Sequence, residues 1–137
     1  MKIIGLDDKE YSWIPSNNIV ETDKRSGPHK KAKALLKELY PNDRILEELI
    51  LPGTKTQNRK STLKADFFIP MRSLIVEVHG LQHSEFNNFF FKNKMDFYKA
   101  QARDRDKKRW CEINELELIE LFDSESIEDW RNKLWRN

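Results

Sequence analysis

Two acidic residues within apolar segments are the first feature of the sequence that bears on chemistry. Asp66 lies in the middle of residues 63–69 (LKADFFI), and Glu77 lies within residues 73–79 (SLIVEVH). Because burial of an uncompensated charge is costly, each carboxylate needs a partner. The short turn at Pro70–Arg72 predicts that the two segments are neighbouring strands, on which Asp66 and Glu77 approach each other. Two carboxylates held together in this way suit a hard divalent cation such as Mg²⁺, which prefers oxygen ligands.

Two histidines follow Glu77 closely, and a further acid lies on a predicted helix. His79 is two residues beyond Glu77, so both side chains point to the same face of a strand, and His83 follows a turn at Gly80. An imidazole titrates near neutral pH, so either histidine has the chemistry of a general base. Asp104 lies on the inward face of its helix, where it could orient a histidine. Each residue alone is better explained by an ordinary structural role, but their convergence on one edge of a sheet favours a catalytic site.

The size and composition of the chain exclude several classes of protein. With 137 residues, 35% of them charged and 11% aromatic, the chain is long enough for one folded domain and is not typical of a disordered protein. Its single cysteine, Cys111, excludes an internal disulfide and a cysteine-rich zinc site. The opening residues lack the features of a signal peptide, and no apolar run reaches membrane-spanning length. We therefore expect a soluble cytoplasmic protein.

Charge is distributed unevenly along the chain. Residues 92–109 contain eight basic and three acidic residues, whereas residues 112–129 contain eight acids and no basic residue. A second basic stretch, in residues 55–64, lies among Thr, Ser, Gln and Asn and is typical of a flexible loop. These segments indicate either a face that binds the phosphates of DNA or solvated surfaces that keep the protein soluble. The predicted nucleic-acid contacts are Lys55, Arg59, Lys60, Lys64, Arg103, Arg105, Lys107 and Lys108.

The hydrophobic pattern predicts an α/β fold in which a mixed four-stranded sheet is flanked by helices, in the order αβββαβα. The predicted helices are 29–39, 94–113 and a last one that begins after residue 123 or 124, and the predicted strands are 44–51, 63–69, 73–79 and 117–122. Residues 1–28 lack periodicity and are predicted to form an irregular N-terminal arm, with at most a short strand at its start. Residues 29–137 are predicted to form a single domain.

Three stretches of the chain resemble the PD-(D/E)XK nuclease superfamily. They are Asp66–Pro70 (DFFIP), Glu77–His83 (EVHGLQH) and Arg103–Lys108 (RDRDKK). Within the superfamily they are similar to the branch that holds the very short patch repair endonucleases and the EDxHD homing endonucleases of phages. The resemblance covers most of residues 29–134. It implies a restriction-endonuclease-like core, a metal-dependent DNA endonuclease of homing or phage-encoded type, and a bacterial or phage-infected host cell.

The resemblance also implies how the ion is bound. Asp66 matches the main metal ligand, with Glu77 and the backbone carbonyl of Val78 beside it. The implied cofactor is Mg²⁺, for which Mn²⁺ is a substitute.

Roles for three other residues follow from the same resemblance. His83 matches the proposed general base, His79 stands in the place of the usual lysine and matches a phosphate or transition-state partner, and Asp104 matches the last acid of the motif. The implied reaction is hydrolysis of a phosphodiester.

The sequence departs from this branch at two points. The branch usually has an acid on its first helix, where this chain has His29, and Glu47 or Glu48 on the next strand is a substitute for that acid. The repair enzymes carry a structural zinc site, for which one cysteine is too few. Nicking in mismatch repair is therefore the weaker form of the prediction.

Other classes of function remain open from the sequence. The chain could be a nucleic-acid-binding module that no longer cuts, or an interaction protein whose acidic C-terminal third binds a basic partner. RNA is an alternative substrate, because the predicted catalytic groups contact phosphate. A domain of this size would reach a long target site through a homodimer or a targeting partner.

Overall fold

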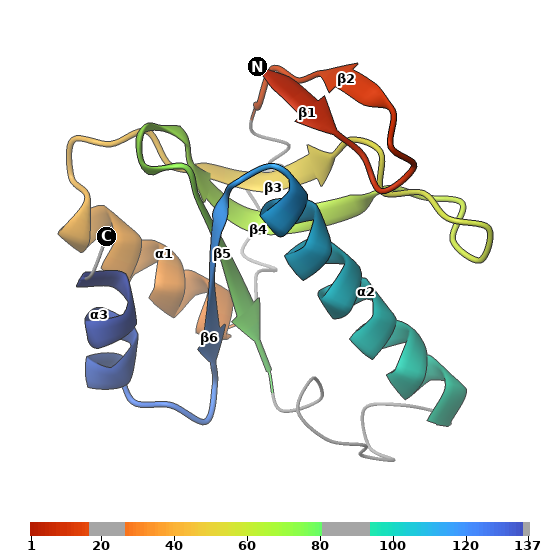
Figure 1. The fold of residues 1–137 in the computed structure, drawn as a ribbon. Helices are drawn as coiled ribbons and strands as arrows, with labels where there is room; N and C mark the ends of the chain where they lie inside the picture. The colour runs from red at the N-terminus through yellow and green to blue at the C-terminus, as the bar shows by residue number, and fades with distance from the viewer. Residues whose placement is uncertain (17–26, 81–93, 136–137) are drawn as a thin grey trace.

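The computed structural model describes residues 1–16, 27–80 and 94–135, and its centre is a four-stranded sheet (Figure 1). The strands are β3 (Leu46–Leu51), β4 (Leu63–Ile69), β5 (Leu74–His79) and β6 (Glu117–Phe122). Their order is β3-β4-β5-β6; the first two neighbouring pairs are antiparallel and β5 is parallel to β6. The helices are α1 (Gly27–Leu39), α2 (Lys94–Ile113) and α3 (Ile127–Trp135), and a 3-10 turn η1 (Pro70–Arg72) joins β4 to β5. The mixed four-stranded sheet predicted from the sequence is confirmed, with boundaries shifted by no more than a few residues.

The sheet separates two hydrophobic cores. Helices α1 and α3 lie on one face and α2 lies on the other (Figure 1). On the α2 face the core contains Ile75 and Trp110, and on the opposite face it contains Val76 and Trp130. The near-continuous apolar run of β5 is therefore buried on both sides, which is the burial expected of a central strand.

The start of the chain is more ordered than the sequence predicts. Strands β1 (Lys2–Ile4) and β2 (Glu10–Ser12) form an antiparallel hairpin, and Ile3 and Trp13 belong to the core on the α2 face. The Trp13 ring stacks on Phe68 with centroids 5.2 Å apart. The sequence predicted at most one short strand at the start of this arm, and the structure has two, because three-residue strands are too short to show a period and are stabilised by contacts with distant core residues. Residues 17–26 lie outside the described part of the chain.

The connection between β3 and β4 is held against α2. The Thr54 hydroxyl, fully buried, donates to the carbonyl of Leu51 (2.7 Å) and accepts from the amide of Leu63 (2.7 Å). The Arg59 guanidinium donates to the Thr54 carbonyl and pairs with Asp106 on α2 at 3.0 Å. Most of the Arg59 side chain is buried and its charge is paired within the fold, and its contact with phosphate stays a prediction.

Strands β3 and β4 share an irregularity at the residues that matter most for chemistry. Leu46 and Leu49 contact the same core although they are three residues apart, and β4 shows the same break in alternation around Asp66. Glu48 lies between two register pairs, so it is opposite Asp66, and its φ of 53° is in the left-handed region. Non-glycine residues rarely adopt this backbone conformation, and where they do it often marks a functional site.

Candidate metal centre

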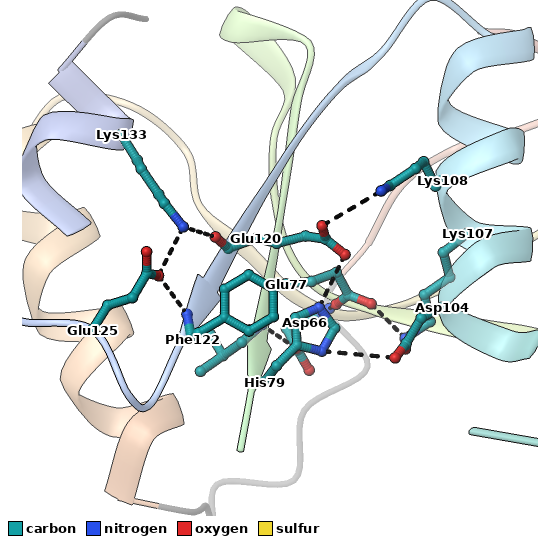
Figure 2. A network of polar contacts seen from close by, with 11 residues as sticks. Asp66, Glu77, His79, Asp104, Lys107, Lys108, Glu120, Phe122, Glu125 and Lys133 are labelled. Atoms are coloured by element: carbon teal, nitrogen blue, oxygen red, sulfur yellow. Dashed lines mark hydrogen bonds and ion pairs between the residues drawn. The ribbon is translucent and has the colours of Figure 1, made fainter. Parts of the chain in front are cut away.

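Glu77 occupies the α2 face of the sheet and has a cationic partner. Its side chain projects from β5 and is 2% exposed. Oε1 forms a close ion pair with the Lys107 ammonium, and Oε2 accepts a hydrogen bond from the Asp66 amide at 2.8 Å (Figure 2). Lys107 was predicted to contact nucleic acid. The structure places most of the Lys107 side chain inside the fold against Glu77, and its contact with nucleic acid stays a prediction.

Asp66 and Glu77 approach each other as the sequence predicts. The hydrogen-bonded register of β4 and β5 runs from Ile69↔Leu74 to Phe67↔Val76. Beyond Phe67 and Val76, the two strands are joined by hydrogen bonds from backbone amides to side-chain carboxylates. Asp66 Oδ2 accepts from the Val78 amide at 2.8 Å, and Glu77 accepts from the Asp66 amide. The Val78 amide is thus the group that contacts Asp66, and metal binding by the Val78 carbonyl stays a prediction.

Burial and proximity shift the protonation of this pair. Burial raises the pKa of Glu77 well above its ordinary value, and the neighbouring Asp66 raises it further, while Lys107 lowers it. For Lys107, burial lowers the pKa, but the attraction and hydrogen bond of Glu77, together with the attraction of Asp66 and Asp104, outweigh burial and raise the net pKa. The ammonium of Lys107 is therefore a stable positive charge inside the site.

A second set of groups surrounds Asp66 from α1 and β3. One ligand atom each from His29, Glu48 and Asp66 lies within 4.8 Å of the others, which is close enough to surround a single ion. His29 is 6% exposed and its ring stacks on Phe67 with centroids 4.5 Å apart. The set offers one nitrogen and two carboxylates from three different elements, and this donor chemistry fits a divalent metal ion.

Glu47 lies beside this set as a neighbour of His29. It is 3% exposed, and its carboxylate is 3.5 Å from Nε2 of His29 and 3.2 Å from the Lys33 ammonium. The sequence left open whether Glu47 or Glu48 substitutes for the acid of the first helix. The structure places Glu48 with Asp66 and places Glu47 behind the imidazole.

His79 lies on the α2 face between two carboxylates. Its Nε2 is 3.2 Å from Glu120 Oε1, and its Nδ1 is 4.0 Å from Asp104 Oδ2 (Figure 2). The ring also stacks on Phe122, with centroids 5.1 Å apart. Asp104 was predicted to orient a histidine, and the structure places its carboxylate beside the His79 ring.

Glu120 is part of this arrangement although the sequence patterns did not single it out. It is the register partner of Glu77 on the parallel strand β6, and Lys108 lies 3.8 Å from its second oxygen. The hydrogen bond from His79 lowers the pKa of Glu120, against the effect of burial. A charge within the apolar run LIELF could have marked Glu120, as a charge within an apolar run marks Glu77. It was missed because the surrounding residues 112–129 are rich in other acids.

An open cleft of about 370 Å³ adjoins these groups between α2 and β6. Its walls are formed by His79, Gln101, Asp104, Arg105, Lys108, Glu120 and Phe122. The cleft is therefore lined both by the His79 imidazole and by two exposed cations of α2, Arg105 and Lys108.

The remaining sequence predictions fall into two groups. His83 lies outside the described residues. The other predicted cations have exposed side chains, and these are Lys55, Lys60, Lys64, Arg103, Arg105 and Lys108. Among the helices that the structure describes, none is long and apolar enough to cross a membrane.

Two uncharacterized viral proteins are similar to about half of this chain. Protein 307L of Invertebrate iridescent virus 6 is 40% identical over 70 residues, which are 51% of this chain and 36% of that protein. Protein 033L of Invertebrate iridescent virus 3 is 43% identical over 61 residues, 44% of this chain and 31% of that protein. The matched regions thus span about a third of the length of each relative. No family model and no solved structure matches the chain.

Proposed function

We propose that this protein is a metal-dependent nuclease that hydrolyses phosphodiester bonds in DNA. The observation that carries the proposal is the position of Asp66. One side of it adjoins the metal-ligand set with His29 and Glu48, and the other side adjoins Glu77, which holds the Lys107 ammonium. A cation-binding group next to a fixed positive charge is the combination that an anionic, pentacovalent transition state requires.

The order of elements supports the same assignment. Helix α1, the antiparallel strands β3 to β5, helix α2, the parallel strand β6 and helix α3 follow one another as in the restriction-endonuclease-like core that the sequence resembles. Asp66 and Glu77 lie on the two central strands of this order. We therefore assign the domain to the PD-(D/E)XK fold as part of the proposal.

Each of the described residues has a defined task in the proposed reaction. A divalent ion bound at Asp66 would neutralise charge on a phosphate oxygen and lower the pKa of a bound water. Lys107 comes from α2 and would supply a positive charge beside Glu77, next to Asp66. His79 is positioned by Glu120 and Asp104 at the cleft, where it can contact the phosphate. The role of His83 as general base stays a prediction from the resemblance.

The surface around the site has the charge needed to bind a polyanion. Arg105 and Lys108 line the cleft, and Arg103 is exposed on the same helix. Lysines that contact phosphates release counterions, so DNA affinity should fall steeply with salt. If about five cations take part, log affinity should fall against log salt with a slope of roughly −4 to −5.

Nicking of supercoiled plasmid, with and without a divalent ion, tests the proposal. We expect ion-dependent relaxation that Lys107→Met reduces strongly, whereas the matched variant Lys37→Met, at an exposed position of α1, should retain it. A single-stranded RNA, assayed in parallel under the same conditions, shows whether cleavage is limited to DNA. Salt-sensitive binding without cleavage under any divalent ion would replace the proposal with a nucleic-acid-binding module.

A further inference from the structure

We propose that the ion at Asp66 is a first-row transition metal bound through a ring nitrogen of His29, together with the carboxylates of Glu48 and Asp66, and that Mg²⁺ is not its preferred occupant. The inference rests on the proposed function for the reaction that the ion serves. The binding itself is independent of nucleic acid and is tested without it.

The donor set is the first reason. His29, Glu48 and Asp66 bring one imidazole and two carboxylates within 4.8 Å of one another. Mg²⁺ favours oxygen ligands in near-ideal octahedral geometry and keeps several waters, whereas imidazole is a favoured ligand of later divalent metals. A site with an obligatory nitrogen therefore selects against Mg²⁺ and favours later metals such as Co²⁺ and Zn²⁺, with Mn²⁺ as a weaker occupant.

The second reason is that His29 is fixed in the site before any ion binds. It lies in the first turn of α1, is 6% exposed and stacks on the Phe67 ring at an interplanar angle of 26°. Glu48 is fixed by a different device, the left-handed backbone at φ 53° opposite Asp66. Ligands held in this way lose little conformational entropy on binding.

Glu47 supplies the third reason. An imidazole that binds a metal through one ring nitrogen usually donates its other N–H to a carboxylate, which fixes the tautomer and strengthens the ligand. Glu47 Oε1 is 3.5 Å from Nε2 of His29, and Lys33 holds the other Glu47 oxygen at 3.2 Å. We infer that Nδ1 of His29 binds the ion and that Glu47, at ion-pair distance from Nε2, is a positioning residue.

The contacts of Glu77 also favour ion binding on the His29 and Glu48 side of Asp66. Oε1 of Glu77 is engaged by Lys107 and Oε2 by the Asp66 amide. A metal ligand at Glu77 would have to give up one of these contacts. The ligand set predicted from the sequence, Asp66 with Glu77, is therefore replaced in this inference by Asp66 with Glu48 and His29.

Pulsed electron paramagnetic resonance of Mn²⁺ bound to the full chain tests the nitrogen ligand directly. The chain has three histidines, so three single variants can locate the nitrogen: His29→Gln, His79→Gln and His83→Gln. We expect an imidazole ¹⁴N coupling in the unsubstituted protein that persists in the His79 and His83 variants and is lost in His29→Gln.

Titration calorimetry with Mg²⁺, Mn²⁺ and Co²⁺ tests the selectivity. The unsubstituted protein should bind Co²⁺ and Mn²⁺ more tightly than Mg²⁺. Glu47→Gln should weaken Co²⁺ binding by about tenfold to hundredfold, the loss typical of an outer carboxylate, and should change Mg²⁺ binding little. Glu112→Gln, at an exposed position of α2, is the matched control and should change neither. Circular dichroism establishes that each variant is folded, and the Glu47 variant keeps the test valid if His29→Gln does not fold.

Several results would overturn the inference: no ¹⁴N coupling in the unsubstituted protein, coupling that survives in His29→Gln, absence of Mn²⁺ binding, or Mg²⁺ binding as tight as that of Co²⁺. The proposed function fails separately. A protein that binds Mn²⁺ through His29 but cuts no nucleic acid would support the inference and refute the nuclease, whereas Mg²⁺-dependent cleavage without nitrogen coupling would do the reverse.

Discussion

The two sides of Asp66 use acidic residues in different ways. On the α2 side, Glu77 pairs with the Lys107 ammonium, and Glu120 is hydrogen-bonded to His79 (Figure 2). On the α1 side, Glu48 and Asp66 come together with an imidazole at ligand distances. The α2 side consists of ion pairs and hydrogen bonds between groups of the protein, and the α1 side brings one nitrogen and two carboxylates to distances that suit a cation.

This difference shows why acid clusters cannot be interpreted from burial alone. Glu77 and Glu47 are both nearly inaccessible, at 2% and 3% exposure. Glu77 touches an ammonium, which offsets its desolvation, and Glu47 lies between an imidazole and the Lys33 ammonium. The identity and geometry of the partners, and not the depth of burial, separate a carboxylate that is paired with an ammonium from one that lies beside an imidazole.

The largest expected effect comes from the residue that the two sides share. Asp66→Asn should reduce metal-dependent cleavage on the order of a thousandfold or more, because the ion loses its central anionic ligand. Folding should be preserved, since the amide oxygen of Asn can still accept from the Val78 amide and repulsion with Glu77 is removed. Single-turnover cleavage and thermal unfolding measure the two effects. Asp123→Asn, at an exposed position after β6, is the control, and full activity in Asp66→Asn would end the nuclease assignment.

Removal of the cation on the α2 side should lower stability as well as cleavage. Lys107→Met leaves the Glu77 charge buried, which should cost about 3 kcal/mol near pH 8, and the double variant Lys107→Met/Glu77→Gln should recover most of it. Burial raises the pKa of Glu77 in the folded state above its unfolded value, so the protonated carboxyl is favoured by folding. The loss should therefore be smaller near pH 5 and should grow as the pH rises through the folded-state pKa.

Urea unfolding at several pH values measures this dependence. Lys108→Met is the matched control, since Lys108 is 57% exposed and should contribute less than about 1 kcal/mol. A Lys107→Met variant as stable as the unsubstituted protein at every pH would mean that the ion pair is not formed in solution, and the contrast between the two sides would disappear.

A smaller effect is expected at Glu120. Glu120→Gln should lower the free energy of unfolding at neutral pH by about 1 kcal/mol or less, because the charged acceptor of the His79 hydrogen bond is lost. The hydrogen bond from His79 lowers the pKa of Glu120, so its stabilisation is present above the unfolded-state pKa and is lost as the pH falls through the folded-state value. The two proteins should thus converge in acid. Glu117→Gln, exposed on the same strand, should show no such convergence.

The smallest effect concerns the thiol beneath the α2 side. Burial raises the pKa of Cys111 to about 12, so almost no thiolate is present at neutral pH. A maleimide or disulfide reagent should label the folded protein very slowly and the urea-unfolded protein rapidly. Lys107→Met should accelerate labelling, and His29→Gln should accelerate it less. Equal acceleration would mean that the two sides do not open independently.

Much of the architecture follows from local sequence. Three adjacent strands follow from the apolar runs of β4, β5 and β6 and from the short Pro70–Arg72 turn. The long helical segment after residue 93 allows β6 to pair in parallel with β5. These are short-range patterns, and the approach of Asp66 to Glu77 follows from them because a tight turn sets the register of two antiparallel strands.

The partners of those acids depend on the tertiary structure. Lys107 and Asp104 lie on the same helix as other charged residues, and nothing in their spacing says that one reaches Glu77 and the other His79. Likewise, the inclusion of His29 with Glu48 depends on how α1 packs on the sheet and on one left-handed residue in β3. Sequence periodicity specifies the face of an element, but the distance between side chains on different elements is fixed only when the two cores pack.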